Sequence, residues 1–114
     1  MVNVAVVTGA NKGIGYGIVE NFVKNLPSQS WVIYLTSRNT ELGQASFTKL
    51  QNAGASNLKY HQLDITVPES RKNFIQFLKN SHPEGVKVWI NNAAIAFKND
   101  APNPMGEQAE VTTK

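Results

Sequence analysis

The sequence predicts an α/β fold in which helices cover both faces of a parallel β-sheet. Short β-branched runs alternate with stretches of helical period along the chain. The resulting order, β-α-β-α-β-α-β, places a helix between successive strands, which is the connection that parallel strands need. A glycine-rich turn, T-G-x-x-x-G-x-G at residues 8–15, joins the first strand to the first helix. Turns of this kind between a strand and a helix are typical of phosphate-binding sites.

Length and composition restrict the class of protein. The 114 residues suffice for one modest domain, and no internal boundary is evident between residues 1 and 114. A hydrophobic content of 41% without a long apolar stretch argues against disorder and against a membrane-spanning helix. The sequence has no cysteine for a disulfide, a thiolate metal site or a nucleophile. The net charge is +3, but lysines and arginines are scattered. We expect no metal, nucleic-acid or membrane partner, and a cytoplasmic location.

The first strand is predicted at Val4–Val7 and is followed by a helix over residues 14–26. Pro27 ends that helix, because proline cannot continue the backbone hydrogen-bond pattern. The apolar side chains of the helix recur with helical spacing, so we expect them to form its core face. These residues are Ile14, Ile18, Val19, Phe22, Val23 and Leu26.

The second strand, Trp31–Thr36, is β-branched and aromatic, and residues 37–40 have the polar character of a turn and a helix cap. A weaker helix is predicted over residues 41–53. Its expected inward-facing residues are Leu42, Ala45, Leu50 and Ala53. Gly43 costs this helix about 1 kcal/mol relative to alanine. Gly54 suits the position just after the helix end.

The third strand is predicted at Leu58–Leu63, and the third helix extends from about Val67 to Asn80. Thr66 and Glu69 have the spacing of a capping box, and Pro68 suits the first turn of the helix. The expected inward-facing residues of this helix are Phe74, Ile75, Phe77 and Leu78.

Two histidines flank the third helix, and the fourth strand follows them. His61, alone in a strand, is most simply a half-buried packing residue, whereas His82 lies in the break after the helix and is expected to be exposed. The fourth strand is predicted at Val86–Asn91. Residues 99–106 are predicted to form a loop, and Glu107–Lys114 to begin a helix.

Right-handed crossovers between these strands permit the order 3-2-1-4. The winding of the sheet then reverses between strands 1 and 4. Ligands of open α/β sheets bind at such a reversal, beside the carboxyl ends of the strands. Thr8–Gly15 and Asn91–Ala94 both lie at those ends. We therefore expect the glycine turn and the fourth-strand asparagines to converge on one site.

The glycine turn, with Gly9, Gly13 and Gly15, has a direct physical use at this site. Glycine tolerates positive φ and lets the backbone approach a ligand closely. The first turn of the following helix adds unpaired N–H groups and a partial positive charge, which suit a pyrophosphate. The alternative is a glycine-rich turn that binds nothing.

Arg38, at the end of the second strand, indicates which dinucleotide would bind. An acidic residue there binds the adenosine ribose of NAD, whereas an arginine accommodates the 2′-phosphate of NADP. Lys12, within the glycine turn, adds a second positive charge. Together these residues favour NADPH over NADH. The alternative is that both are solvated surface residues.

Polar residues also follow the third and fourth strands. Asp64 could accept a hydrogen bond from an adenine amino group while Ile65 packs on the ring. Alternatively, Asp64 only helps to cap the next helix. Asn91 and Asn92 could bind a ribose or join the strand ends to one another.

These motifs resemble the short-chain dehydrogenase/reductase family. The matching residues are Thr8-Gly9-x-x-x-Gly13-Ile14-Gly15, Asp64, and Asn91-Asn92-Ala93. The stretches GANKGIG, LTSR, HQLDI, NNAAIAFK and GEQAEVTTK are similar to those of its NADPH-dependent carbonyl reductases. The resemblance implies a Rossmann-like, doubly wound sheet and an enzyme that uses NADPH to reduce ketones, aldehydes or quinones.

The resemblance also implies roles for individual residues. Those expected to contact NADP(H) are Asn11, Lys12, Ile14, Arg38, Asp64, Ile65, Asn91 and Ala93. Phe97 and Lys98 match the family's segment near the substrate or glutathione-conjugate site. Ala94 departs from the family, which usually has glycine there, and its Cβ could crowd the nicotinamide.

The family's catalytic residues find no match in this chain. By resemblance, the catalytic Asn follows the segment that matches Glu110–Lys114, and the Ser and the Tyr-x-x-x-Lys pair come later still. Tyr16, Tyr34 and Tyr60 are poor substitutes, because none has a lysine four positions on. We therefore expect residues 1–114 to be the N-terminal, NADPH-binding part of a carbonyl reductase, with no or almost no catalytic activity alone. A non-catalytic, truncated NADPH-binding module is the alternative.

A sheet that ends after its fourth strand would expose that strand as an edge. Unpaired edge strands invite pairing with other chains. We therefore expect exposed apolar surface, with self-association through the fourth strand or low stability.

Overall fold

The computed structural model describes residues 2–92 and 111–113. At its centre is a five-stranded sheet in the order β3-β2-β1-β4-β5. The strands are β1 (Asn3–Val7), β2 (Trp31–Ser37), β3 (Leu58–Gln62), β4 (Val88–Ile90) and β5 (Val111–Thr113). The helices are α1 (Gly13–Asn25), α2 (Thr40–Asn52) and α3 (Pro68–Ser81). Strands β1 to β4 are parallel in the order 3-2-1-4, which confirms the predicted fold class and topology.

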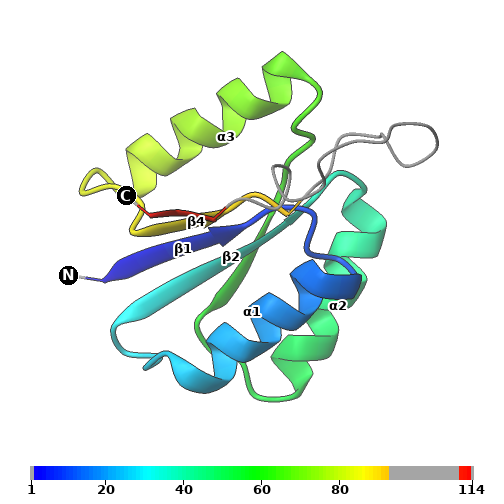
Figure 1. Cartoon of the computed structure of the whole chain (residues 1–114), viewed down its shortest axis with the longest axis vertical. Coiled ribbons are helices and arrows are strands. Elements are labelled where there is room, and N and C mark those ends of the chain that lie inside the picture. Colours follow the sequence, from blue (N-terminus) through cyan, green and yellow to red (C-terminus); the bar gives the residue numbers. More distant parts are fainter. Residues whose placement is uncertain (1, 93–110, 114) are drawn as a thin grey trace.

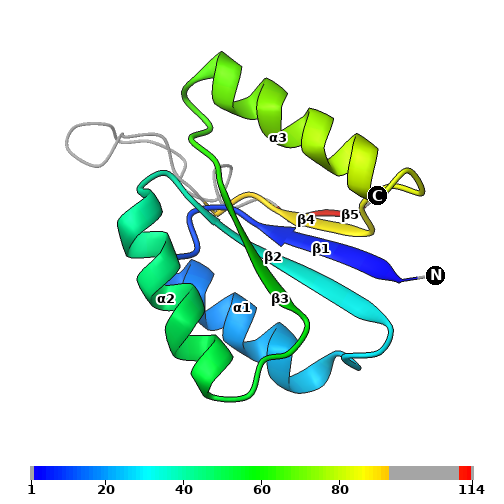
Figure 2. The same cartoon turned by 180° about the vertical axis from the view of Figure 1, so that it is seen from behind.

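The helices form two layers, one on each face of the sheet (Figure 1). Helices α1 and α2 cover one face and α3 covers the other, as the view from behind also shows (Figure 2). Side chains alternate along β1, so Ala5 and Val7 face one layer while Val4 and Val6 face the other. All four are fully buried, which explains why this strand is a continuous apolar run.

Helices α1 and α2 each have a glycine at a close contact: Gly15 lies against the glycine turn and Asn92, and Gly43 against Ser37 and Tyr60. Ile14 is 76% exposed and Leu42 is 55% exposed, so the prediction that they face the core is wrong. The next residue in each helix, Gly15 or Gly43, is buried instead. A glycine at the contact lets the helix approach closely, and the bulkier residue before it then points to solvent. Three further residues predicted to face inward are also exposed: Ala45, Ala53 and Ile75.

The helix ends follow the predicted chemistry only in part. The side chain of Asn39 caps α2 by accepting a backbone N–H at 2.9 Å, and Gly54 follows the helix at φ = +110°. Pro68 begins α3, as predicted. The predicted capping box there is wrong. The hydroxyl of Thr66 instead donates to Asp64 Oδ1 at 2.6 Å, and α3 has no side-chain cap.

Strand β5 corrects two predictions about the end of the chain. Residues 111–113 form a strand, although a helix was expected over Glu107–Lys114. This strand pairs antiparallel with β4, and Trp89 faces Thr112 in the register. The sheet therefore does not end after β4, whose outer edge is paired rather than exposed. Self-association through that edge loses its physical basis, because the backbone groups already have partners. The loop predicted over 99–106 lies outside the described residues.

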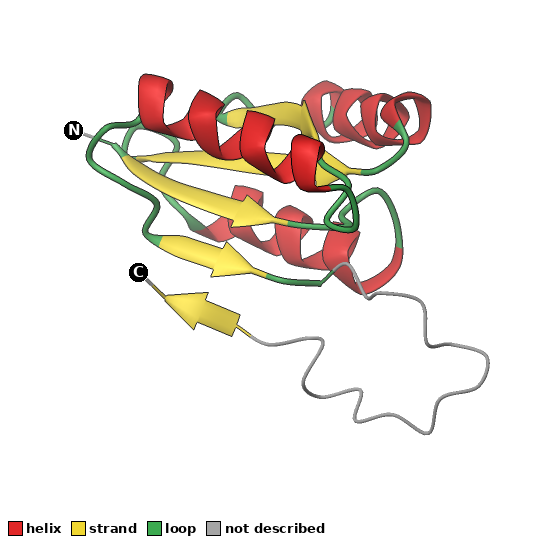
Figure 3. Ribbon diagram, turned by 90° about the horizontal axis from the view of Figure 1, so that it is seen from above, coloured by secondary structure: helices red, strands yellow, loops and turns green. Residues whose placement is uncertain are grey.

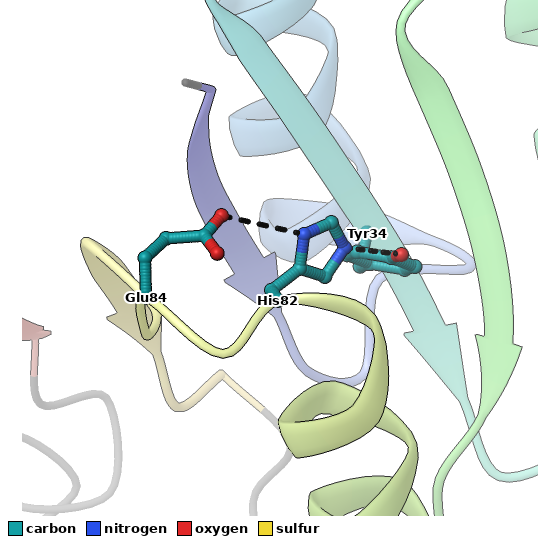
Figure 4. A network of polar contacts seen from close by, with 3 residues as sticks. All are labelled: Tyr34, His82 and Glu84. Carbon is teal, nitrogen blue, oxygen red and sulfur yellow. Dashed lines mark hydrogen bonds and ion pairs between the residues drawn. The ribbon is translucent and has the colours of Figure 1, made fainter.

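The two histidines behave differently from each other. His82 is half-buried, and its Nε2 lies 2.8 Å from the hydroxyl of Tyr34 (Figure 4). Its Nδ1 lies 3.8 Å from the carboxylate of Glu84. The prediction of an exposed His82 is therefore wrong, because the ring of His82, at the end of α3, packs 5.6 Å from that of Tyr34 on β2. His61 is half-buried as predicted, and its ring packs 4.7 Å from that of Phe77.

Candidate functional site

The carboxyl ends of β1 to β4 lie at one side of the sheet, where the loops to the helices begin (Figure 3). The turn 9–12 follows β1, Arg38 follows β2, and Asp64 comes shortly after β3. Asn91 and Asn92 follow β4. The topology thus gathers the predicted site residues of four strands along one edge, as parallel pairing requires.

The glycine turn is held against β2 and α2 by its backbone. Ala10 N donates to Thr36 O at 2.9 Å, which anchors the turn to the end of β2. The hydroxyl of Ser46, on α2, donates to Asn11 O at 2.6 Å. Gly9 and Gly13 have φ values near +60° (59° and 63°), a region that L side chains rarely adopt. A Cβ at Gly13 would meet no atom within 4 Å, so the space beside this glycine is open.

Asn92 joins the end of β4 to the glycine turn. Its Nδ2 donates to Gly9 O at 3.0 Å and its backbone N–H donates to Thr8 Oγ1 at 2.9 Å. A Cβ at Gly15 would lie 2.5 Å from Asn92 Nδ2, so this glycine makes room for the asparagine. Of the two uses considered for Asn92, the structure shows the structural one. Asn91 Oδ1 accepts a hydrogen bond from the indole N–H of Trp89 at 2.8 Å.

The first turn of α1 is an open donor site. Lys12 occupies the N-cap position in an extended conformation and makes no side-chain cap hydrogen bond. The first turn contains no acidic residue. The unpaired N–H groups and the positive end of the helix dipole are therefore available to an anion. Lys12 and Ile14 are both exposed at this end of the helix.

Arg38 follows β2 in a segment with hydrogen-bonded carbonyls. The carbonyl of Ser37 accepts from Leu63 N at 2.9 Å, and that of Asn39 accepts from Ser37 Oγ at 2.8 Å. The carbonyl of Arg38 itself accepts from Gln62 Nε2 at 3.1 Å. Arg38 is exposed, and its guanidinium has no hydrogen-bond or ion-pair partner among residues 2–92. The backbone is held in place while the charged group remains available.

Asp64 is held as a carboxylate by its neighbours. Hydrogen bonds from the hydroxyl (2.6 Å) and the backbone N–H (2.9 Å) of Thr66 keep the pKa of the Asp64 carboxyl below its usual range. Burial acts in the opposite direction, and the positive charge of Arg38, the weakest of these influences, also lowers the pKa. Both bonds end on Oδ1, so Oδ2 remains an acceptor without a partner in the described part of the chain. The carboxylate therefore shapes the local turn and can still bind a donor.

Within residues 2–92 and 111–113, no helix is long and apolar enough to cross a membrane. The same residues contain no group of three or more His, Cys, Asp or Glu side chains placed to hold a metal ion. The site offers N–H donors and two cations, which suit phosphate groups, together with one carboxylate, which suits a hydrogen-bond donor.

The model of the short chain dehydrogenase family matches residues 3–113, nearly the whole sequence. The chain belongs to the short-chain dehydrogenase family. Its glycine turn, Arg38 and the residues after β3 and β4 are therefore parts of a short-chain dehydrogenase domain.

Curated short-chain dehydrogenases similar to the chain include carbonyl reductases. The protein named carbonyl reductase [NADPH] 3 from Rattus norvegicus is 42% identical over 111 residues, which are 97% of this chain and 38% of that protein. Carbonyl reductase [NADPH] 1 from Homo sapiens is 42% identical over 113 residues, or 99% of this chain and 39% of that protein. The chain thus spans somewhat more than a third of the length of these relatives.

Solved structures of short-chain dehydrogenases share the fold. Salutaridine reductase from Papaver somniferum superposes with a TM-score of 0.71 at 35% identity, covering 82% of this chain and 31% of that one. A metagenomic short-chain oxidoreductase in complex with NADP gives a TM-score of 0.66 at 30% identity, covering 82% of this chain and 39% of that one.

The structure of this short-chain dehydrogenase gathers those predicted site residues that it describes at one edge of the sheet. Ala93, Ala94, Phe97 and Lys98 lie outside the described residues. Ile65 is half-buried beside the core cluster under α3. The sequence-based prediction did not single out Gln62, whose amide reaches the Arg38 carbonyl. The available signal was a polar residue at the last position of a strand, directly before the Leu63-Asp64 pair.

Proposed function

We propose that this region binds NADP(H) and prefers it to NAD(H). The observation that carries the proposal is the unpaired guanidinium of Arg38 at the end of β2, beside a glycine turn with an uncapped helix. An arginine at this place offers two parallel hydrogen bonds to a phosphate, which the 2′-position of NADP supplies and NAD lacks. The printed names of the relatives, which include NADPH, and the NADP complex of a 30%-identical neighbour support this choice.

Each part of the site has a role in this proposal. The pyrophosphate would lie over the N–H groups at the start of α1. Gly9 and Gly13, both at positive φ, have no side chain that would keep the ligand away from the backbone. Arg38 and Lys12 would bind the 2′-phosphate. Asp64 Oδ2 would accept from the adenine amino group while Ile65 packs on the ring. The remaining proposed contacts are Asn11, Ile14, Gly15, Asn91 and Ala93.

The proposed reaction is the reduction of ketones, aldehydes or quinones, by analogy with the carbonyl reductases that the chain resembles. NADPH supplies the hydride when it is bound. The residues of this chain would position its adenosine and pyrophosphate parts, and Asn92 would keep the turn in place through Gly9. Phe97 and Lys98 are proposed to lie on the substrate side.

A second candidate function is NADPH binding without catalysis. The described tyrosines favour it, because each is engaged elsewhere. Tyr34 is buried and contacts His82, and the hydroxyl of Tyr60 contacts Ser37 Oγ at 2.9 Å. The ammonium of Lys49 lies 5.7 Å from the centre of the Tyr16 ring. None of these residues is arranged as a proton donor to a carbonyl at the site.

The binding proposal is tested by titrating the chain with NADPH and NADH, using calorimetry or fluorescence. We expect tighter binding of NADPH. Arg38→Ala should weaken NADPH binding about ten-fold, because it removes charge-assisted hydrogen bonds to the 2′-phosphate, and should leave NADH binding nearly unchanged. Lys24→Ala, which removes an exposed cation near the other end of α1, is the control. Equal affinities for the two cofactors, or no binding of NADPH, would contradict the proposal.

A turnover assay tests whether residues 1–114 catalyse the reduction by themselves. NADPH oxidation is followed at 340 nm (a general property of the reduced nicotinamide) with a ketone, an aldehyde and a quinone. Binding without turnover is the outcome expected of residues 1–114 alone, whereas turnover above the protein-free rate would show that these residues catalyse the reduction by themselves.

A further inference from the structure

Gln62 lies beside Arg38 and Asp64 in the candidate site. It is the last residue of β3 and is half-buried. Its side-chain amide faces the segment after β2 on one side and the first turn of α3 on the other. An amide that both donates and accepts can bind two partners at once. The role of Gln62 therefore depends on which groups it joins.

A continuous series of hydrogen bonds passes through this side chain. Gln62 Nε2 donates to the carbonyl of Arg38 at 3.1 Å. The hydroxyl of Ser70, in the first turn of α3, donates to Gln62 Oε1 at 3.1 Å. The same hydroxyl accepts from the backbone N–H of Asp64 at 2.8 Å. Arg38 and Asp64, which follow different strands, are thus joined through two side chains.

The hydrogen bond from Gln62 is the side-chain contact that reaches Arg38 itself. The neighbouring carbonyls of Ser37 and Asn39 are bound by other groups, including Leu63 N. The carbonyl of Arg38 depends on the amide of Gln62 within the described residues. The guanidinium has no hydrogen-bond partner within the described residues, so the backbone is the part of Arg38 that the protein holds in place. Loss of the Gln62 amide would leave Arg38 at the end of β2 but with a less well-defined orientation.

We propose that Gln62 is a positioning residue that sets coenzyme preference by holding Arg38 and Asp64 in a fixed relation to each other. This inference rests on the proposed binding of NADP(H). Gln62 acts on the adenosine end of the dinucleotide alone. The glycine turn is anchored separately, through Thr36 and Ser46, so the pyrophosphate contacts do not depend on Gln62.

The test uses Gln62→Met, which keeps the length and apolar volume of the side chain but removes both hydrogen bonds. We expect this variant to lose about five-fold in NADPH affinity and to lose less in NADH affinity, because the 2′-phosphate contact of Arg38 is absent from NADH, so the preference falls. Adenosine 2′,5′-bisphosphate, which carries the 2′-phosphate without the nicotinamide half, should show the same loss. Gln76→Met is the matched control. It removes an exposed amide contact to Asn80 on α3 and should leave all affinities unchanged.

A double-mutant cycle with Arg38→Ala separates positioning from general destabilisation. If Gln62 acts through Arg38, Gln62→Met should have no further effect on the NADPH-to-NADH preference in the Arg38→Ala background. An equal loss of affinity for both cofactors, or an unchanged preference, overturns the role of Gln62 while leaving the binding proposal intact. Absence of NADPH binding by the unmodified chain overturns both.

A second variant keeps the test decisive if Gln62→Met does not fold. Ser70→Ala removes the other end of the hydrogen-bond series and places a good helix former in the first turn of α3. We expect it to lower the NADPH preference in the same direction. A folded Ser70→Ala protein with the preference of the unmodified chain overturns the proposal.

Discussion

At the residue scale, the contact between Tyr34 and His82 is a polar pair that joins β2 to the end of α3 (Figure 4). Tyr34 is 2% exposed, and its hydroxyl meets His82 Nε2 at 2.8 Å. A buried hydroxyl needs a partner, because an unmade hydrogen bond would cost its desolvation energy. Burial also raises the pKa of the Tyr34 phenol above its ordinary value.

We expect Tyr34→Phe to lower the free energy of unfolding by about 1 kcal/mol at pH 7, because His82 Nε2 loses its partner. The raised pKa of Tyr34 makes the phenol's contribution present below about pH 10 and lost as the pH rises through the folded-state value. The variant should therefore lack part of the alkaline fall in stability.

Urea unfolding at pH 7 and above pH 10 measures both effects. His82→Ala is the control, because it removes the same hydrogen bond but keeps the phenol. An alkaline fall of equal size in Tyr34→Phe would contradict the assignment.

The pKa of Asp64 is shifted in the opposite direction from that of Tyr34, so its effect on stability has the opposite pH dependence. Its pKa is lowered mainly by the hydroxyl of Thr66, so Thr66→Val should raise the Asp64 pKa toward the ordinary value of about 3.9. The stabilisation is present above the unfolded-state pKa and is lost as the pH falls through the folded-state value. NMR titration of the Asp64 carboxyl measures the shift, with Thr48→Val, at an exposed position in α2, as the control. An unchanged titration would show that the hydroxyl does not act on the carboxylate.

At the scale of elements, Gly43 decides how closely α2 approaches the sheet. A Cβ at Gly43 would clash with Ser37 Oγ and with the ring of Tyr60. Ser37 is the last residue of β2, directly before Arg38, and the hydroxyl of Tyr60, on β3, contacts it. A residue that is unfavourable for helix formation thus permits a contact that helps to shape the candidate site.

We expect Gly43→Ala to destabilise the protein by about 1–3 kcal/mol, because overpacking exceeds the gain in helix propensity. Gly17→Ala is the matched variant. It lies in α1, is exposed, and its Cβ would meet no atom within 4 Å. It should stabilise the protein by about 0.5–1 kcal/mol. Chemical denaturation measures the change in the free energy of unfolding of both variants. A stabilised Gly43→Ala protein would contradict the packing argument.

At the scale of the whole molecule, the sheet separates two hydrophobic cores. Helices α1 and α2 share one of them, whereas α3 covers the other face alone (Figure 1). On that face, Phe74 is fully buried and its ring packs against those of His61 at 4.9 Å and Trp89 at 5.8 Å. The second core therefore depends strongly on a few aromatic contacts.

We expect Phe74→Ala to lower the free energy of unfolding by about 3–5 kcal/mol, because it leaves a cavity beneath α3. Ile75→Ala, on the same helix but 41% exposed, should cost less than about 1 kcal/mol. Thermal or chemical unfolding compares the two variants. Similar losses in the free energy of unfolding for the two variants would show that α3 does not depend on Phe74 for its packing against the sheet.

The parts of the fold that follow from local patterns were predictable. Hydrophobic period and turn residues indicated strands β1 to β4, helices α1 to α3 and their order. Strand order followed from the handedness of crossovers. At the candidate site, the glycine turn, Arg38 and Asp64 were identifiable because they lie at fixed positions relative to strand ends.

Other features depend on contacts between residues far apart in the sequence. A periodic pattern does not say which residue of a helix touches the sheet, so Ile14 and Leu42 were misplaced by one position. The burial of His82, the pairing of β5 and the bond from Gln62 to Arg38 also required the assembled structure. The sequence by itself determined strands β1 to β4, helices α1 to α3 and their order, because these depend on neighbouring residues. Only the tertiary structure decided helix rotation and polar partners, because these depend on the shapes that meet across the sheet.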